Sequence, residues 1–456
     1  MKLERLALAG VLLSILAVPS AAENFGVKYL YINRCAGNCI VHKGDDDART
    51  MNTDGYFNQD PGGTQYTVTA WRHGDPAWNQ LMTCLKEVYS PYDIEVSDVP
   101  PTPGVPFSMG IVAGSNLEVN SPGAGGYAAI NTNCTPRAYG LSFTFANDYG
   151  AATPDDIYEI CAVVGQETAH SFGLRHSYEF LDGRSAGPDP MTYRFYVGER
   201  FFRNEPARCG EFQVGQCGAC GATQNTHQHL TNFLGKGTPI TPPPEVTLTA
   251  PANNATIANE ATVTATASAR RGIAVVELLL NGYKWAEVKG SYDPDPQGFG
   301  VKLPPDVPDG VIDVVLRAKD DIGESTDTPP ITVTKGAPCA TADTCAAGQR
   351  CDAGKCFWDP PVGVLGDECT YQQFCINEQC QAIDTGEQRC TQNCVLGIAD
   401  SCPVDFECLA TGATGGVCWP SDALDKGTCG CGSSGSPQAL VLLLGLGAIL
   451  VRRRRR

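Results

Sequence analysis

Hydrophobic residues in the first half of the chain follow the two-residue period of strands in some stretches and the 3.6-residue period of helices in others. Short apolar runs predict strands at 27–32, 94–96, 108–112 and 141–145. Helical patterns are predicted at 77–89, from 154 onward and at 226–234. Thr153 and Pro154 provide a cap and a first-turn residue for the second of these helices. This order of elements predicts a mixed α/β domain over residues 23–236.

A different pattern begins after the proline-rich linker at 237–244. Residues 245–335 contain no cysteine and alternate in short runs that are separated by Pro, Gly and Asp turns. The predicted strands are 246–248, 261–267, 275–280, 311–318 and 331–334. This pattern favours a β-sandwich and resembles the Ig-like modules of bacterial surface proteins, with the strand pattern alone carrying the resemblance.

Cysteine dominates the third part of the chain, residues 337–420, which hold twelve of the 22 cysteines. Too few apolar residues are present there for a large core, so disulfides must hold the segment together. The spacing of Cys339, Cys345, Cys351 and Cys356 recurs in Cys369, Cys375 and Cys380, which predicts a repeat of small disulfide units. We therefore expect an α+β multidomain chain that ends in a disulfide-rich region.

The eight cysteines of the first domain form an even set, which also favours disulfides. Cys35 and Cys39 are close enough for a local bridge, while Cys84 and Cys161 lie in predicted helices that they could tie to loops. The Cys217-Gly218-Ala219-Cys220 run lacks the strand–helix–strand context of a redox motif, so a structural role is favoured.

Both ends of the chain carry targeting patterns. A basic start, an apolar run and the small residues Ser20 to Ala22 predict a signal peptide at 1–22. Within 428–456, two cysteines precede a short apolar run and five arginines, which resembles the myxobacterial C-terminal sorting signal. An ordinary membrane anchor is the alternative. In both cases we expect a secreted protein held at the cell surface or outer membrane, which meets the membrane only through this anchor.

The formal net charge of −17 argues against nucleic acid as a partner. The Asp45-Asp46-Asp47 cluster could bind Ca²⁺, but an acidic surface loop is the favoured interpretation. No pattern in the sequence indicates an oligomeric state.

The strongest chemical pattern lies in residues 166–176. Glu167 precedes His170 by three positions, and Gly173 separates His170 from His176, although the whole chain has only six histidines. In a helix, Gln166 and His170 lie one turn apart on the same face. Gly173 can leave the helix with a positive φ, so that His176 returns to the same point.

This run resembles the zinc signature of the metzincin peptidases, HExxHxxGxxH. The resemblance implies that His170 and His176 bind zinc and that Glu167 is the general base for hydrolysis. It also implies that strand 141–145 is the sheet edge along which an extended protein or peptide substrate is held.

A second likeness follows the histidines. Met191 and Tyr193 stand where metzincins have their methionine turn, in the Met-x-Tyr form of the astacin and serralysin branches. The resemblance implies that Met191 lies beneath the metal and that Tyr193 ligates it or stabilises an oxyanion.

The sequence departs from the signature at Gln166, which replaces the first histidine ligand. A neutral amide oxygen is a weaker zinc ligand than imidazole. Three outcomes are open: Gln166 binds through its oxygen, His227 or His229 supplies the missing nitrogen, or the metal is lost. The leading hypothesis is a surface-anchored zinc endopeptidase acting on extracellular proteins or peptides. The alternative is a weak or inactive domain that serves as an adhesin or peptide-binding module.

Overall fold

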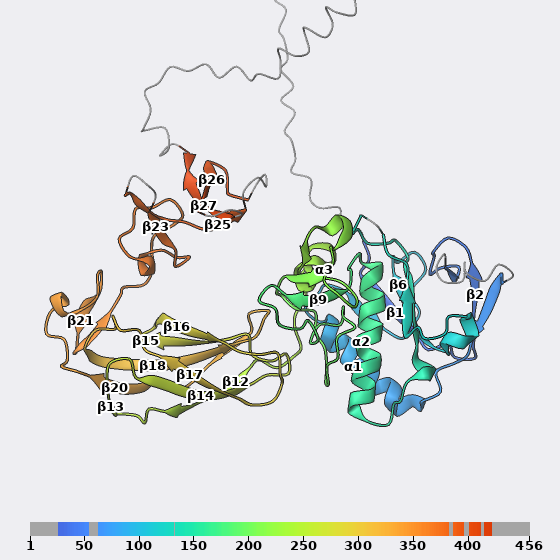
Figure 1. The fold of residues 1–456 in the computed structure, drawn as a ribbon, viewed down its shortest axis with the longest axis horizontal. Helices are drawn as coiled ribbons and strands as arrows, with labels where there is room; N and C mark the ends of the chain where they lie inside the picture. The colour runs from blue at the N-terminus through green and yellow to red at the C-terminus, as the bar shows by residue number, and fades with distance from the viewer. Residues whose placement is uncertain are drawn as a thin grey trace, which may run out of the picture. The chain divides into compact units, whose positions relative to one another are not determined.

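The computed structural model describes residues 26–53, 63–131, 133–382, 386–395, 401–411 and 415–421. The chain divides into two compact units, residues 1–305 with 313–333 and residues 306–312 with 334–456. The described structure is mostly β, and its α-helices are α1 (Gly74–Tyr89), α2 (Pro154–Ser171) and α3 (Thr226–Leu234) (Figure 1). The predicted signal peptide at 1–22 and the C-terminal segment at 428–456 lie outside the described residues. No described helix is long and apolar enough to cross a membrane.

A five-stranded mixed sheet organises the first domain, in the order β5-β1-β6-β8-β7. Its strands are β1 (Tyr29–Asn33), β5 (Glu95–Ser97), β6 (Ser108–Ala113), β7 (Gly126–Ala128) and β8 (Leu141–Phe145). Four of them are parallel, and β7 runs antiparallel to β8. Every residue of β6 and β8 is buried, as expected of parallel strands that are covered on both faces.

The predicted strands of this sheet are confirmed, but the predicted edge is wrong. β8, at 141–145, pairs with β6 on one side and β7 on the other. The edge strand beyond β8 is instead β7. The sequence pattern did not predict this strand because of Gly126 and the preceding Gly125, since glycine is depleted in strands and interrupts an apolar pattern.

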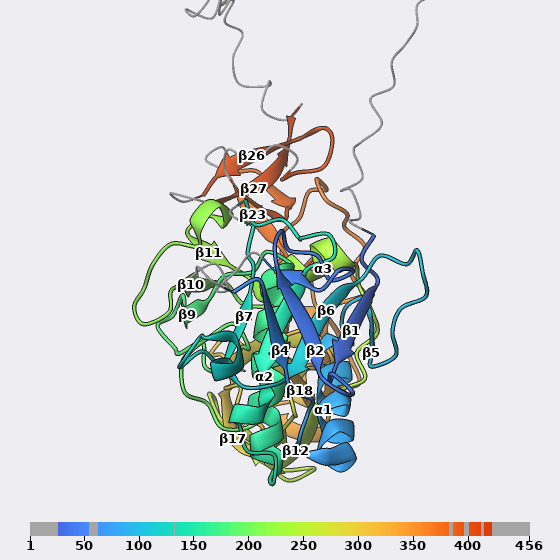
Figure 2. The same cartoon turned by 90° about the vertical axis from the view of Figure 1, so that its right-hand side faces the viewer.

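Helices α1 and α2 lie side by side (Figure 2), and a disulfide between Cys84 and Cys161 joins them. The expectation that these cysteines tie helices to loops is therefore wrong. The bridge spans 77 positions of sequence, and sequence spacing does not reveal such a pairing. The core between the helices and the sheet includes the buried residues Leu30, Ile32, Leu81, Leu85, Val112, Ile160 and Val164.

A small sheet covers the other face of the five-stranded sheet. It has the order β3-β2-β4 and consists of β2 (Cys39–Lys43), β3 (Asn52–Thr53) and β4 (Gln65–Val68). Val41 and Val68 pack in one cluster with Ile111, Phe143 and Phe145 of the large sheet. A third sheet, β11-β10-β9, contains β9 (Ser177–Phe180), β10 (Ala207–Cys209) and β11 (Thr223–Gln224).

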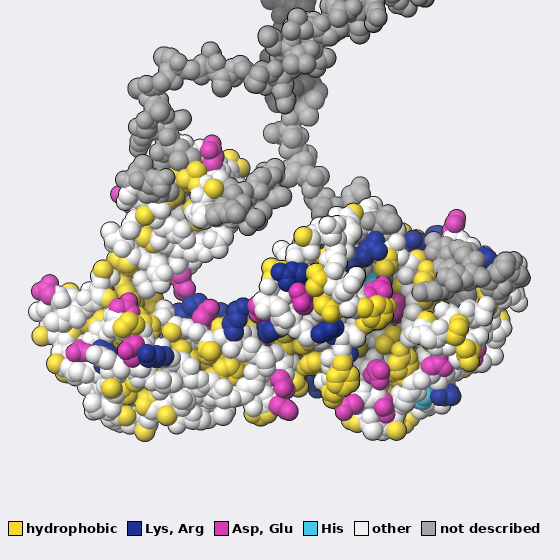
Figure 3. Space-filling view, in the orientation of Figure 1, with side chains coloured by type: hydrophobic (Ala, Val, Ile, Leu, Met, Phe, Trp, Pro, Cys, Tyr) yellow, Lys and Arg dark blue, Asp and Glu magenta, His cyan; other side chains and the backbone are white. Residues whose placement is uncertain are grey.

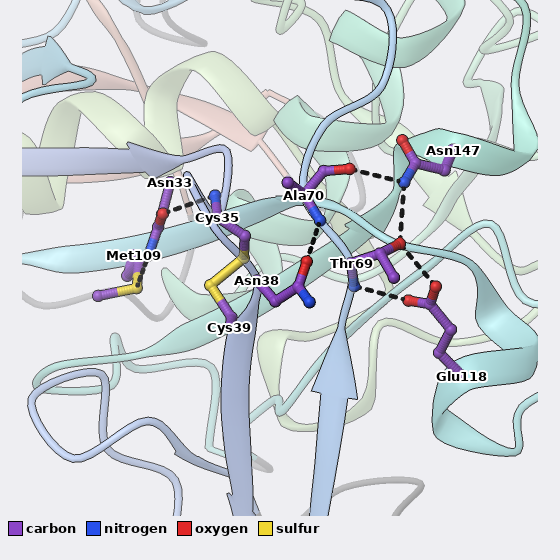
Figure 4. Close-up of a disulfide and its surroundings, with 9 residues drawn as sticks. All are labelled: Asn33, Cys35, Asn38, Cys39, Thr69, Ala70, Met109, Glu118 and Asn147. Carbon is purple, nitrogen blue, oxygen red and sulfur yellow. Dashed lines mark hydrogen bonds between the residues drawn. A yellow bond between two sulfur atoms is a disulfide. The ribbon is translucent and has the colours of Figure 1, made fainter.

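The predicted bridge between Cys35 and Cys39 is present and closes the loop that enters β2 (Figure 4). Asn38 in this loop accepts a hydrogen bond from the Ala70 amide at 3.1 Å. Asn147, in the short helix η3 (Ala146–Asp148), donates to the Ala70 carbonyl at 3.0 Å. These side chains tie three separate loops together at one end of the large sheet.

The middle region is a β-sandwich, as predicted. One sheet has the order β12-β14-β17, with β12 (Glu245–Ala250), β14 (Thr262–Ser268) and β17 (Gln297–Lys302). The other has β13 (Thr256–Ile257), β20 (Ile331–Lys335), β18 (Gly310–Lys319), β15 (Val275–Leu280) and β16 (Tyr283–Lys289), with β19 (Ser325–Asp327) beside β18. Burial alternates along all ten residues of β18, as expected where one face of the strand is turned to a core.

The cysteine-rich region forms three disulfide modules, so the predicted repeat is confirmed. In each module the first cysteine pairs with the third and the second with the fourth. The pairs are Cys339–Cys351, Cys345–Cys356, Cys369–Cys380, Cys375–Cys390, Cys394–Cys408 and Cys402–Cys418. The strands are β21 (Arg350–Asp352), β22 (Lys355–Phe357), β23 (Cys380–Ala382), β24 (Gln388–Cys390), β25 (Asn393–Val395), β26 (Phe406–Ala410) and β27 (Gly415–Pro420). The sulfur clusters of this region are thus disulfides, which lack the thiolates that bind metal.

Candidate metal centre

Helix α2 positions the first three site residues. It begins with a capping box, in which the Thr153 hydroxyl accepts from the Asp156 amide and the Asp156 carboxylate accepts from the Thr153 amide. Its last two turns carry Gln166, Glu167 and His170, and all three are at least nine-tenths buried. A polar group is costly to bury without a partner, so apolar packing alone does not account for these three residues at the end of the helix.

Gly173 turns the chain back toward the helix. Its φ is +95°, and a Cβ at this position would lie 2.6 Å from the Cys134 carbonyl oxygen, so only glycine fits. The Gly173 amide donates to the His170 carbonyl at 2.9 Å and closes the helix. His176 then returns to the helix end, where its Nε2 lies 2.9 Å from Nε2 of His170. The predicted convergence of the two imidazoles is therefore present.

The hydrogen-bond partners of the two Nδ1 atoms, on the outer side of the pair, determine whether each facing Nε2 carries a hydrogen or a lone pair. Nδ1 of His170 lies 2.7 Å from the Leu174 carbonyl oxygen, and Nδ1 of His176 lies 3.1 Å from Oε1 of Glu211. A carbonyl or carboxylate oxygen only accepts, so each Nδ1 carries the hydrogen. In a neutral imidazole the lone pair is then on Nε2, and two lone pairs face each other at 2.9 Å. This arrangement repels unless a cation lies between the two nitrogens.

Protonation of the imidazoles is an unfavourable source of that cation. Burial, together with the smaller effect of the neighbouring His176, lowers the pKa of His170 to about 3. Burial also lowers the pKa of His176, although Glu211 opposes this shift. Both rings are therefore neutral near pH 7. Nitrogen ligands bind zinc at about 2.0–2.1 Å, which requires two of them to lie roughly 3 Å apart. The two histidines meet that requirement, with their outer nitrogens held as in known zinc sites.

Gln166 supplies a further observation that fits a cation. Its Nε2 is buried and has no hydrogen-bond partner among the described residues. An amide with one uncommitted end can present its oxygen to a cation instead, because the two ends of the amide group are interchangeable in shape. The donor set of two imidazoles and one amide oxygen is weaker than three imidazoles but suits a divalent transition metal.

Glu167 lies against the edge strand. A Cβ on Gly126 of β7 would come within 2.5 Å of Glu167 Cγ and 2.7 Å of the Phe143 carbonyl oxygen. The absence of a side chain at position 126 thus lets the strand approach the carboxylate. Burial raises the pKa of Glu167 to about 8.

Met191 is fully buried in the same core cluster as Ala169 and Leu174, which flank His170. The Asp189 carboxylate accepts from the Met191 amide at 2.8 Å and holds the turn. Two residues later, Tyr193 is half exposed, and its ring centroid lies 4.4 Å from that of His176. The structure therefore brings Tyr193 to the histidine pair.

One cleft of about 880 Å³ is lined by the two histidines and the polar side chains around them: Gln166, Glu167, His170, His176, Tyr193 and Glu211. Residues 124–128 of the β7 edge form one wall, and Tyr193, Phe195 and Phe212 contribute aromatic side chains to another. Phe195 and Phe212 are more than three-quarters exposed. On the face in Figure 3, acidic and basic side chains are interspersed over the described surface.

Other candidate residues have different roles. His227 contacts the Tyr92 hydroxyl at 3.0 Å, His229 contacts the Phe172 carbonyl at 2.8 Å, and neither lines the cleft. The structure thus does not support either as a replacement ligand. Asp47 pairs with Arg49, and that guanidinium lowers the pKa of the Asp47 carboxyl. Cys217 pairs with Cys209 and not with Cys220, which rules out a redox pair at this motif.

Comparison with known proteins identifies one part of the chain. Residues 244–297 match the bacterial Ig domain family. No curated protein matches. Among solved structures, the chain is similar to fibronectin(III)-like modules of Clostridium thermocellum CbhA, with 13% identity, a TM-score of 0.15, and 20% of this chain and 94% of that chain covered. It is also similar to a Jonesia denitrificans lytic polysaccharide monooxygenase, at 13% identity and a TM-score of 0.16 over 27% of this chain and 75% of that one.

A third similar structure is an endo-beta-1,4-mannanase from Thermotoga petrophila, at 12% identity and a TM-score of 0.15, covering 43% of this chain and 37% of that chain. At such scores these likenesses carry no argument about function. The Ig-like module is the part of the chain that the comparisons support.

Sequence reasoning missed three contributors to the site. Glu211 contacts His176 from 35 positions away, and Asp189 holds the turn at Met191. β7 forms a wall of the cleft. Asp189 stands two residues before Met191, so its buried carboxylate could have been suspected. The other two depend on tertiary packing.

Proposed function

We propose that residues 23–236 form a metal-dependent endopeptidase domain of the metzincin type, which hydrolyses peptide bonds in extracellular proteins or peptides. The convergence of the His170 and His176 lone pairs at 2.9 Å carries this proposal. Disulfides in both units favour an oxidising compartment, which supports export of the chain to the cell surface.

His170, His176 and Gln166 are the residues that would hold the cation, for which zinc is the best candidate. When bound, zinc would supply Lewis acidity toward a peptide carbonyl and would make a water molecule more acidic. Glu167 would take a proton from the attacking water and give it to the leaving amine. Tyr193 would donate its hydroxyl to the oxygen on which negative charge develops.

The edge strand suggests how a substrate would be held. An extended peptide can add to an exposed sheet edge by main-chain hydrogen bonds. β7 is such an edge, and its residues line the cleft beside Glu167. This geometry favours internal peptide bonds of an extended chain as the substrate.

A second function is favoured by one observation, the replacement of an imidazole ligand by Gln166. If the weakened site holds no metal, the same cleft would bind peptides without cleaving them. The domain would then serve as an adhesin beside the Ig-like module.

The test uses the exported, oxidised full chain. We expect about one zinc per chain by elemental mass spectrometry and cleavage of unstructured proteins that chelation abolishes. Glu167→Gln should keep the metal and lower kcat at least about a hundredfold. Asp155→Asn, in the exposed first turn of the same helix, is the matched control and should change neither. Unchanged peptidase activity in Glu167→Gln would contradict the proposal, and absence of metal would favour the adhesin.

A further inference from the structure

Two buried arginines connect the first domain to the Ig-like module within the first compact unit. Arg203 comes from the first domain and Arg271 from the module, and both side chains are almost fully buried. Arg271 binds the Asp321 carboxylate at 3.0 Å, and Arg203 lies 3.6 Å from the same group. Burial would raise the pKa of Asp321, but the two arginines hold it below its ordinary value.

Backbone groups complete this junction. Arg203 donates to the Arg271 carbonyl at 2.5 Å, and Arg271 donates to the Phe202 carbonyl at 2.9 Å. The Asn204 amide donates to Asp321 at 3.0 Å. Each charged group therefore has partners on both sides of the junction. Such groups resist separation, because the loss of one partner leaves the other buried without compensation.

Tyrosines and the linker extend the same junction. Tyr292 of the module donates its hydroxyl to Glu205 at 2.6 Å, while the Tyr196 hydroxyl donates to the Tyr292 carbonyl at 2.7 Å. In the linker, the Gly237 amide donates to the Pro91 carbonyl at 2.8 Å. A proline-rich linker predicts a spacer between independent modules. Here the linker is instead hydrogen-bonded to the first domain.

The segment that the module grips also holds the methionine turn. Asp189, whose carboxylate holds the Met191 amide, accepts from the Arg203 amide at 3.1 Å. The Arg203 side chain donates to the Pro188 carbonyl at 3.3 Å, where the turn begins. Arg200 donates to the Thr192 carbonyl at 3.1 Å, next to Tyr193. Both ends of the turn therefore depend on residues 200–203.

We propose that the Ig-like module is a positioning element of the peptidase site, which keeps Met191 and Tyr193 in place by clamping residues 200–205. This inference rests on the proposed peptidase function for its kinetic consequence. Its structural part, the coupling of Asp321 to the turn at 188–193, stands independently. Asp321 and Tyr292 act as positioning residues, since neither lines the catalytic cleft.

The test compares two variants of the full chain with a matched control. Asp321→Asn removes the charge that the arginines share, and Tyr292→Phe removes only the hydroxyl that binds Glu205. Asp327→Asn is the control, because Asp327 pairs with Arg317 at an exposed site of the same module. Hydrogen exchange is measured at the amides of Asp189, Met191, Thr192 and Tyr193, together with kcat and KM for a peptide substrate.

We expect Asp321→Asn to speed exchange of the Met191 amide about tenfold. It should lower kcat about tenfold with little change in KM, since small misplacement of catalytic groups is costly. Tyr292→Phe should shift both in the same direction by less, and it decides the question if Asp321→Asn fails to fold. Exchange at 188–193 equal to the parent chain in a folded variant would overturn the coupling. If the parent chain proves to have no peptidase activity, the exchange measurement still tests the coupling.

Discussion

The candidate metal centre and the cysteine-rich region are stabilised in opposite ways. In the cysteine-rich region each disulfide joins residues 11 to 16 positions apart, so every module is closed by its own segment of chain. At the candidate centre, the two histidines are only six positions apart, but Glu167 meets β7 and His176 meets Glu211 from 35 positions away. The modules depend on local covalent links, whereas the site depends on long-range packing.

The two regions should respond differently to the loss of a single bridge or contact. The structural effect of losing a disulfide in one cysteine module should be confined to that module, because the neighbouring modules have their own bridges. The loss of a packing contact or bridge inside the first domain should reach the site even from a distance, because α2, β7 and the loop at Glu211 are held together only by tertiary packing. The two regions can therefore be separated by experiment.

The largest effect is expected from removing the bridge between the helices. Cys84→Ala with Cys161→Ala opens a loop of 77 positions, which should lower the free energy of unfolding of the first domain by about 4.5 kcal/mol. Denaturant unfolding followed by fluorescence of Trp78, which is buried in α1, would measure this loss.

Cys369→Ala with Cys380→Ala is the comparison, since it opens a loop of only 11 positions and should cost about 3 kcal/mol. That loss should appear as proteolysis within its own module, with unchanged metal binding. Equal damage to metal binding from both double variants would contradict the contrast between the regions.

A smaller effect is expected where the edge strand meets the carboxylate. Gly126→Ala places a methyl group 2.5 Å from Glu167 Cγ, so the strand or the carboxylate must shift. We expect kcat to fall about a hundredfold while zinc stays bound, since misplacing a reacting group by an ångström has effects of this size. Steady-state kinetics with parallel metal analysis would measure it. Gly298→Ala, which meets no atom within 4 Å, is the control. Loss of zinc in Gly126→Ala would mean that the strand supports the metal ligands themselves.

The features that could be predicted from the sequence are the local ones, and those that could not are the long-range ones. Features set by neighbouring residues were predicted, such as the Thr153–Pro154 helix start, the turn at Gly173 and the repeated cysteine spacing. Features set by distant partners were not, such as the edge position of β7 and the pairing of Cys84 with Cys161. Whether Gln166 binds a metal stays a prediction, since neither the sequence nor the conformation of the side chain identifies what its amide oxygen binds.

The smallest effect is expected at Glu211, the long-range partner of His176. Glu211→Ala removes the acceptor for the His176 Nδ1 hydrogen and leaves that ring free to rotate or to change tautomer. Outer-shell partners of this kind typically contribute 10- to 100-fold to metal affinity, and because the Glu211 side chain is about half exposed we expect about tenfold weaker zinc binding. Competition with a chromophoric chelator would measure the affinity. Glu245→Ala, an exposed residue at the start of β12, should leave it unchanged. An unchanged affinity in Glu211→Ala would show that His176 is oriented by its own loop, so that this half of the site is as local as a cysteine module.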